Sequence, residues 1–224
     1  MVTLINYTLR NVKMTNLKIN KSGFKLKKCN FIKEATSKDR IVIGNTYSTD
    51  MNHFIGWELR FGGAYKKTSM FTIKLDGTIY QHFSPNYYSE VFENRRINET
   101  SITILLENEG WLELYNDEKN EYITSMGYIY NRNGSVIHKK WRNKTYWAPY
   151  SEEQLESVYR LCEKLCSEFN IPLKAISHNT NIENPNKYHG VVYKSNFNKH
   201  HTDVNPNWDC NWIKSKLENI DYEN

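Results

Sequence analysis

Arg40-Ile41-Val42-Ile43-Gly44-Asn45-Thr46 is the stretch of this 224-residue chain that decides the fold. Three consecutive β-branched residues, with a charge before them and Gly-Asn after them, predict a short strand buried on both faces, as in the middle of an α/β sheet. Ligands of open α/β sheets bind beyond the carboxyl ends of the strands. We therefore expect residues 44 to 46 to face the functional site.

The composition is that of an ordinary folded protein. Hydrophobic residues make up 39% of the chain, aromatic residues 14% and charged residues 25%, which argues against disorder over most of it. The length fits one domain, with or without an appendage. The chain begins without a signal-peptide pattern, and no apolar run is long enough to cross a bilayer. We therefore expect a protein retained in the cytoplasm, with no membrane partner.

Charge and cysteine usage narrow the possible partners only a little. The net charge of +5 suits an anionic ligand, although a solvated lysine-rich surface is the simpler explanation, and we do not expect a nucleic-acid partner. Four cysteines are present, and none forms a CxxC pair. Cys162 and Cys166 fall on the apolar face of a predicted helix, where buried thiols explain them better than a disulfide or a zinc site.

The local pattern predicts further elements around the first strand. Alternating residues on both sides of Asp76-Gly77 predict a hairpin over 71–83, and the apolar run 101–106 predicts another strand. A helix begins after Ser151, which can cap it, and carries an apolar stripe to Phe169. We also expect a short helical turn within 49–56.

The remaining segments are predicted from weaker patterns. Residues 174–178 are expected to form a short returning strand, followed by a polar loop to about residue 202 and a terminal helix that begins at Trp208. Residues 122–130 and 136–141 are expected to pair as two strands around Asn133-Gly134, on the surface of the main sheet. Weak alternation before residue 30 is compatible with one or two strands.

The order of these motifs resembles the zinc-dependent N-acetylmuramoyl-L-alanine amidases, a family that includes phage endolysins and peptidoglycan recognition proteins. The likeness runs from about Phe31 to Trp212. It is carried by the segments 31–38, 41–46, 71–81, 101–108, 146–154, 171–172, 177–178 and 202–206. The resemblance implies an α/β fold with a central mixed β-sheet flanked by helices. It divides the chain into an N-terminal extension at 1–29 and an amidase-like domain at 30–216, with an aromatic insertion at 111–150 and a loop insertion at 179–201.

The family's chemistry uses a zinc ion held by three protein ligands, with a fourth position open for water. In the resemblance, His178 matches the His that follows the returning strand, and Asp203 matches the acidic ligand. The His at the end of the first core strand falls on Gly44, which has no side chain to offer. The implied metal site, His178 with Asp203, is therefore incomplete.

Other positions that carry the family's catalysis are also replaced. The usual Glu of the second core strand is Leu105, and the Tyr that serves in some phage members falls on Ser69. The His before the hairpin's Phe is Met70, and the Lys two residues before the Asp ligand is His201. Because these losses occur together, the resemblance implies a degenerate member without confident catalytic residues and with no cofactor.

We therefore expect a binding module that uses the former active-site groove. The ligand would be a muropeptide or another peptidoglycan fragment, or a small anionic molecule such as a nucleotide signal sequestered by a phage-encoded protein in the host cytoplasm. No P-loop or GxGxxG supports a standard nucleotide site. The expected ligand-binding residues are Asn45, Tyr65, Lys67, Tyr88, Arg95, His178, Tyr193, Lys194 and His201.

Two alternatives remain open. In the first, the chain is an active amidase whose zinc site is rearranged, with His53, His82, His200 or His201 joining His178 and Asp203. In the second, the chain has a structural or protein-interaction role, and the Tyr- and Trp-rich segment 111–150 is the contact surface.

Overall fold

A six-stranded mixed sheet forms the centre of the molecule, described here from a computed structural model that covers residues 17–132 and 136–208. Its strand order is β1-β4-β3-β5-β2-β10. The strands are β1 (Ile19–Asn20), β2 (Arg40–Asn45), β3 (Phe71–Ile73), β4 (Ile79–Gln81), β5 (Ser101–Leu106) and β10 (Gly190–Tyr193). Neighbouring strands are parallel except for the antiparallel pair β3 and β4, so the expected mixed α/β sheet is confirmed.

β2 lies between β5 and β10, and all six of its residues are buried, as its sequence predicts. Successive side chains of a strand point to opposite faces of the sheet. Ile41 and Ile43 belong to the hydrophobic core, whereas Val42 and the neighbouring β5 residues Thr103 and Leu105 line a cavity. Gly44 pairs in register with Leu105 and shares its face of the sheet.

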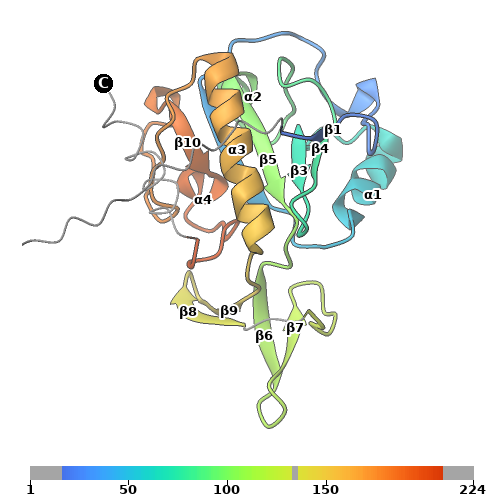
Figure 1. Cartoon of the computed structure of the whole chain (residues 1–224), viewed down its shortest axis with the longest axis vertical. Helices are drawn as coiled ribbons and strands as arrows, with labels where there is room; N and C mark the ends of the chain where they lie inside the picture. Colours follow the sequence, from blue (N-terminus) through green and yellow to red (C-terminus); the bar gives the residue numbers. More distant parts are fainter. Residues whose placement is uncertain (1–16, 133–135, 209–224) are drawn as a thin grey trace, which may run out of the picture.

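Helices cover both faces of this sheet (Figure 1). The long helix α3 (Glu152–Phe169) packs on the face that carries Ile41 and Ile43, and α1 (Asn52–Leu59) lies on the cavity face. Ser151 Oγ accepts a hydrogen bond from Gln154 N at 3.1 Å, so the expected N-cap is confirmed. Cys162 and Cys166 are buried free thiols on α3, and burial raises the pKa of each.

The predicted hairpin joins β3 and β4, with Gly77 at φ +80° in its turn. Short helices complete the connections: η1 (Lys28–Asn30), η2 (Arg60–Gly63), α2 (Arg95–Thr100) and η3 (Pro185–Lys187). β1 extends the sheet beyond β4, so part of the expected N-terminal extension is joined to the main sheet. The rest of that extension and the expected terminal helix after Trp208 lie outside the described residues.

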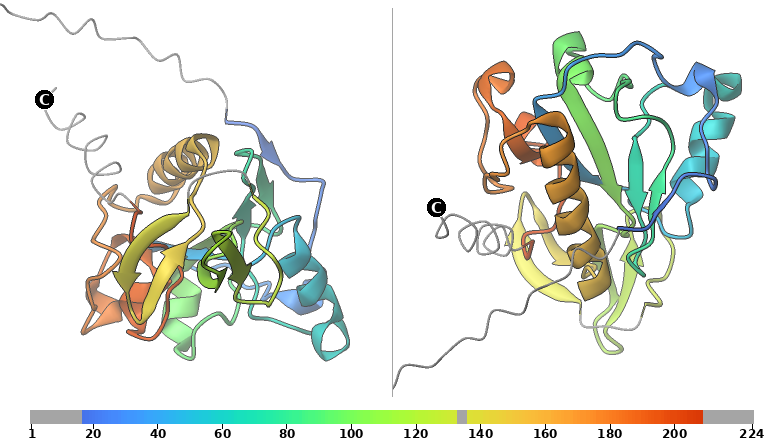
Figure 2. Two further views of the ribbon diagram at one scale, coloured as in Figure 1. Left: turned by 90° about the horizontal axis from the view of Figure 1, so that it is seen from below. Right: turned by 45° about the horizontal axis from the view of Figure 1, so that its top comes forward.

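The aromatic insertion forms a second, four-stranded sheet with the order β7-β6-β9-β8. Its strands are β6 (Trp111–Asn116), β7 (Glu121–Thr124), β8 (Ile137–Trp141) and β9 (Lys144–Trp147). The expected pairing of 122–130 with 136–141 is wrong, because β7 pairs with β6 and β8 pairs with β9. Figures 1 and 2 show this sheet beyond the carboxyl ends of β2 and β5, not on a face of the main sheet.

The returning strand also differs from the expectation. Residues 174–178 contribute only a single bridge, from Ala175 to Val191, and the strand that pairs with β2 is β10. β10 lies inside the segment expected to be a loop insertion, and the short helix α4 (Lys194–Phe197) follows it directly. No helix in the described part of the chain is long and apolar enough to span a membrane.

Candidate functional site

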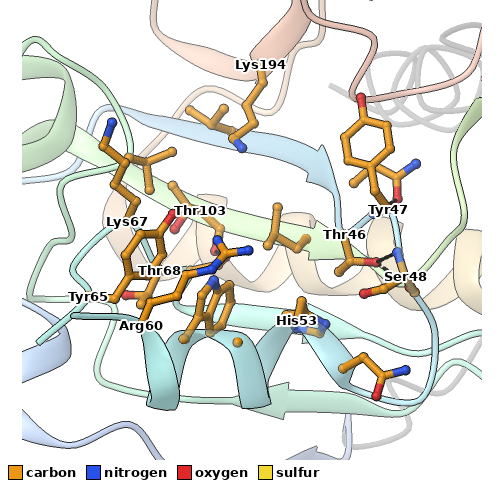
Figure 3. A pocket seen from close by; sticks show the side chains of 18 of the residues that line it. Thr46, Tyr47, Ser48, His53, Arg60, Tyr65, Lys67, Thr68, Thr103 and Lys194 are labelled. Carbon is orange, nitrogen blue, oxygen red and sulfur yellow. Dashed lines mark hydrogen bonds between the residues drawn. The ribbon is translucent and has the colours of Figure 1, made fainter. Parts of the chain in front are cut away.

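A cavity of about 410 Å³ opens at the carboxyl ends of β2 and β5, between α1 and the segment before β3 (Figure 3). The loop that follows β2 forms one wall, and α1 forms another. The lining residues are Val42, Asn45, Thr46, Tyr47, Ser48, Asn52, His53, Gly56, Trp57, Arg60, Tyr65, Lys67, Thr68, Ser69, Val91, Thr103, Leu105, Met126 and Lys194. The location beyond the first core strand agrees with the expectation from the sequence.

The charged residues of this lining are all basic. Arg60, Lys67 and Lys194 reach it from three different segments, and the described lining contains no Asp or Glu. The Arg60 guanidinium lies 5.3 Å from the centre of the Tyr65 ring, which places a cation beside an aromatic face. The cavity therefore favours a ligand with a negative group and an apolar or aromatic part.

Lys194 is held at the end of β10 by a buried network. The Asn196 side chain accepts from Tyr193 N at 2.7 Å and donates to the carbonyls of Ser177 (2.8 Å) and Thr180 (2.6 Å). Asn196 is fully buried, so these bonds fix the backbone on which Lys194 lies. In Figure 3 the Lys194 side chain points from this segment into the cavity.

Asp203 forms an ion pair with Lys194 and a close contact with the His201 ring. Its Oδ1 is 3.6 Å from Lys194 Nζ, and its Oδ2 is 3.1 Å from His201 Nδ1. Burial raises the pKa of Asp203, but the charges of Lys194 and His201 outweigh burial, so that its pKa falls below the ordinary value. Asp203 is therefore ionised at neutral pH and already paired.

Gly44 provides the space that the Lys194 side chain occupies. A Cβ atom added at Gly44 would lie 2.7 Å from Lys194 Cδ, 3.1 Å from Leu105 Cδ2 and 3.5 Å from Asp203 Oδ1. The first distance is well below van der Waals contact. Gly44, Lys194 and Asp203 thus converge on one volume at the carboxyl ends of β2 and β10.

The other replaced positions have ordinary structural roles in this fold. Leu105 is nearly buried and lines the cavity beside Gly44. The Ser69 hydroxyl lies within hydrogen-bonding distance of the carbonyls of Thr103 (2.8 Å) and Phe71 (3.0 Å). Met70 is fully buried in the core. None of these three side chains presents an acid or base to the cavity.

The residues at the expected metal position do not fit zinc. The position directly after the returning strand is Lys194 rather than His178, because β10 and not 174–178 is the strand beside β2. Gly44 has no side chain, and an ammonium has no lone pair for a metal, so Asp203 is the remaining donor of the three. In the described residues, no three His, Cys, Asp or Glu side chains lie together as a metal-binding group.

The histidines considered for a rearranged site lie in different environments. His178 packs edge-on against the Trp141 ring at 5.0 Å, and burial near Lys139 and Arg142 lowers its pKa to about 4. His53 and His82 both lie within hydrogen-bonding distance of Thr72 Oγ1, at 3.0 and 2.8 Å.

The remaining two histidines, His200 and His201, are adjacent in the sequence. Both side chains are exposed, and His201 Nδ1 contacts Asp203 Oδ2.

Four of the nine expected ligand-binding residues line the cavity, namely Asn45, Tyr65, Lys67 and Lys194. The other five lie elsewhere. Tyr88 bonds Glu34, and the exposed Arg95 pairs with Glu99. The hydroxyl of the buried Tyr193 accepts from Trp208 Nε1. His178 and His201 have the contacts described above.

The lining residues that the sequence did not predict as ligand-binding come mainly from α1 and from the loop after β2. His53, expected from the sequence only as an alternative metal ligand, is followed by Trp57 and Arg60 at spacings of four and three, which is one face of a helix. This spacing could have revealed them. Thr46, Tyr47 and Ser48 could have been found by extending the first strand into the loop that follows it.

Comparison with known proteins agrees with this architecture. The sequence profile described as N-acetylmuramoyl-L-alanine amidase matches residues 34–203. The chain therefore belongs to the N-acetylmuramoyl-L-alanine amidase family. A search of curated proteins found no match.

Two solved structures share the fold. The N-acetylmuramoyl-L-alanine amidase LysC from Clostridium intestinale URNW aligns with a TM-score of 0.50 and 14% identity, over 90% of this chain and 97% of that chain. The endolysin LysCS from the same organism has the same TM-score and identity, over 90% and 95% of the two chains.

Proposed function

We propose that this chain is a member of the amidase family that binds a ligand in the cavity but does not hydrolyse an amide. The observation that carries this proposal is the position of Lys194, whose ammonium lies against Asp203 where the family's pattern calls for a metal ligand. A positive side chain at this position repels a metal cation, and Gly44 offers no compensating donor.

The loss of a general base supports the same proposal. Leu105 faces the cavity at the position of the family's Glu, and the Ser69 hydroxyl is engaged by two carbonyls. Neither the family's Glu nor its Tyr is present to activate water. His53 also lines the cavity, but burial lowers its pKa to about 3 and its ring lies against Thr72 Oγ1, so it is a poor general base. The cavity itself is lined by polar, aromatic and apolar side chains.

The lining supports a ligand with a carboxylate or phosphate group. Lys194 Nζ is 3.6 Å from Asp203, longer than a hydrogen bond, so its N–H groups can donate to a ligand in the cavity. Arg60 and Lys67 add positive charge without a carboxylate in the lining. A muropeptide, which carries peptide carboxylates, is the ligand we favour, and a small anionic molecule such as a nucleotide is the alternative within the same proposal.

Calorimetry with N-acetylmuramoyl-L-alanyl-D-isoglutamine and with a panel of nucleotides tests this function. We expect one of these ligands to bind without turnover, and Lys194→Met to weaken binding by roughly 10-fold to 100-fold through loss of a charged hydrogen bond. The matched control is Lys119→Met, which removes an exposed lysine from the turn between β6 and β7 that is not part of the lining. Release of L-alanyl peptides from peptidoglycan by the wild-type protein would contradict the proposal.

A further inference from the structure

Gly44 and Lys194, at the ends of β2 and β10, are neighbours in space, and each depends on the identity of the other. Gly44 and Lys194 come from strands that are paired in register, Ile43 with Tyr193, so the residues that follow this pair lie side by side. The aliphatic stem of Lys194 occupies the volume in which a Gly44 side chain would begin, because an added Cβ would approach Lys194 Cδ to 2.7 Å. A side chain at position 44 and the present Lys194 conformation therefore exclude each other.

The ammonium of Lys194 has a fixed partner in this arrangement. The Asp203 side chain is only 5% exposed, and that of Lys194 is 23% exposed. A buried carboxylate needs a compensating charge, and removing one partner of such a pair is strongly unfavourable. Lys194 supplies this charge from one side of the carboxylate, and the His201 ring contacts the carboxylate from the other.

We infer that Lys194 is the resident cation of this site: its ammonium takes the electrostatic place of a metal ion, and Gly44 is the substitution that makes room for it. The two residues thus act as one coupled replacement, and neither can be reverted alone. A histidine at position 44 collides with Lys194, whereas a histidine at position 194 lacks its partner. Only the two changes together direct two imidazoles and the Asp203 carboxylate to a single point.

Zinc binding by engineered variants tests this inference independently of the natural ligand. We expect Gly44→His with Lys194→His to bind one zinc ion, on the order of 100-fold or more tighter than either single variant, because three ligands are then available. Adding Asp203→Asn to the double variant should abolish the gain. Cobalt absorption in the visible range reports whether the ion is held in a tetrahedral site.

Two outcomes would overturn the inference. One is zinc binding by Gly44→His alone as tight as by the double variant, since Lys194 would then not occupy the metal position. The other is a double variant that keeps its helical circular dichroism and binds no zinc.

A second measurement tests the pairing of Lys194 with Asp203 and does not require the double variant to fold. Titration of the Asp203 carboxyl by carbon-13 NMR should show a higher pKa in Lys194→Met than in the wild type. An unchanged Asp203 titration in a folded Lys194→Met protein would show that the ammonium is not its counter-ion, and the inference would fail. A failure of either test leaves the proposed ligand binding to be judged by calorimetry.

Discussion

At the scale of single residues, Gly44 is explained by space rather than by backbone conformation. It lies within β2 in a regular parallel ladder with β5, and it is not among the described residues with positive φ. Glycine at such a position normally weakens a strand. Here it allows the Lys194 side chain to pass over β2 and reach Asp203.

Substituting Gly44 should therefore destabilise the fold although alanine is the better strand residue. We expect Gly44→Ala to lower the free energy of unfolding by about 1–3 kcal/mol, because the new methyl group overpacks Lys194 and Leu105. Gly56→Ala is the matched control, since Gly56 lies in α1 and its added Cβ meets nothing closer than Arg60 Nε at 3.9 Å. That change should stabilise the protein by about 0.5–1 kcal/mol. Urea unfolding of both variants measures the difference, and equal effects would refute the steric explanation.

The sequence pointed to Gly44 and Leu105 separately, as replaced positions on two predicted apolar strands, and the structure pairs them in register. It did not point to Lys194 as the residue after the returning strand. Only four residues form β10, a polar loop precedes it and the short helix α4 follows it, so its pattern is too short to stand out. The run 174–178 has a similar pattern, and tertiary pairing with β2 distinguishes the two.

At the scale of elements, the second sheet braces the segment that carries the site. Arg142, in the turn between β8 and β9, donates to the carbonyls of Ser195 (2.9 Å), Asn198 (2.9 Å) and His201. Lys139 Nζ donates to Pro206 O at 2.9 Å. The loop with His201 and Asp203 is therefore attached to the aromatic insertion as well as to β10.

Removing the Arg142 hydrogen bonds should affect the site, although Arg142 does not line the cavity. We expect Arg142→Met to lower the free energy of unfolding by about 1.5–3 kcal/mol, since three carbonyls lose a charged donor. Ligand affinity should fall as well, because Asp203 and Lys194 lose their common support. Lys140→Met, an exposed change in β8, is the control. Thermal unfolding of both variants, with and without the muropeptide or nucleotide that binds, measures these effects. Equal melting temperatures and equal shifts on ligand addition in Arg142→Met and Lys140→Met would contradict this account.

The elements themselves were predictable where hydrophobic period and capping agreed. β2, β5, the 71–83 hairpin and α3 all have strong local patterns, and the structure contains each of them. The pairing of the aromatic insertion was not predictable, because four short strands with similar aromatic content allow several registers. Its actual order places β9 beside β6, a contact between residues far apart in the sequence.

At the scale of the whole molecule, buried histidines tie stability to pH. Burial lowers the pKa of His53 to about 3 and that of His82 to about 4, and the two rings share the Thr72 hydroxyl. Both histidines are therefore neutral in the folded protein over most of the pH range. Protonating either one would place a charge beside the Thr72 hydroxyl, between α1 and β3.

Acidification should therefore destabilise the protein before the carboxylates titrate. Between pH 6.5 and about 4 the unfolded chain binds more protons at these histidines than the folded one, so stability falls as the pH falls. The slope is at most about 1.4 kcal/mol per pH unit for each histidine. Denaturant unfolding at several pH values measures it, with the exposed His200→Asn as a control and His53→Gln expected to flatten the curve. A curve that is flat in the wild type would contradict the burial of both rings.

The whole molecule has the mixed α/β sheet of the amidase fold, with α3 on one face and a cavity on the other, and we propose that a lysine occupies the metal position. The most direct test of this account is the zinc content of the purified wild-type protein after incubation with zinc and dialysis, measured by mass spectrometry. The account predicts far less than one zinc ion per chain, with no change in Asp203→Asn. One zinc ion per chain that is lost in Asp203→Asn would contradict it.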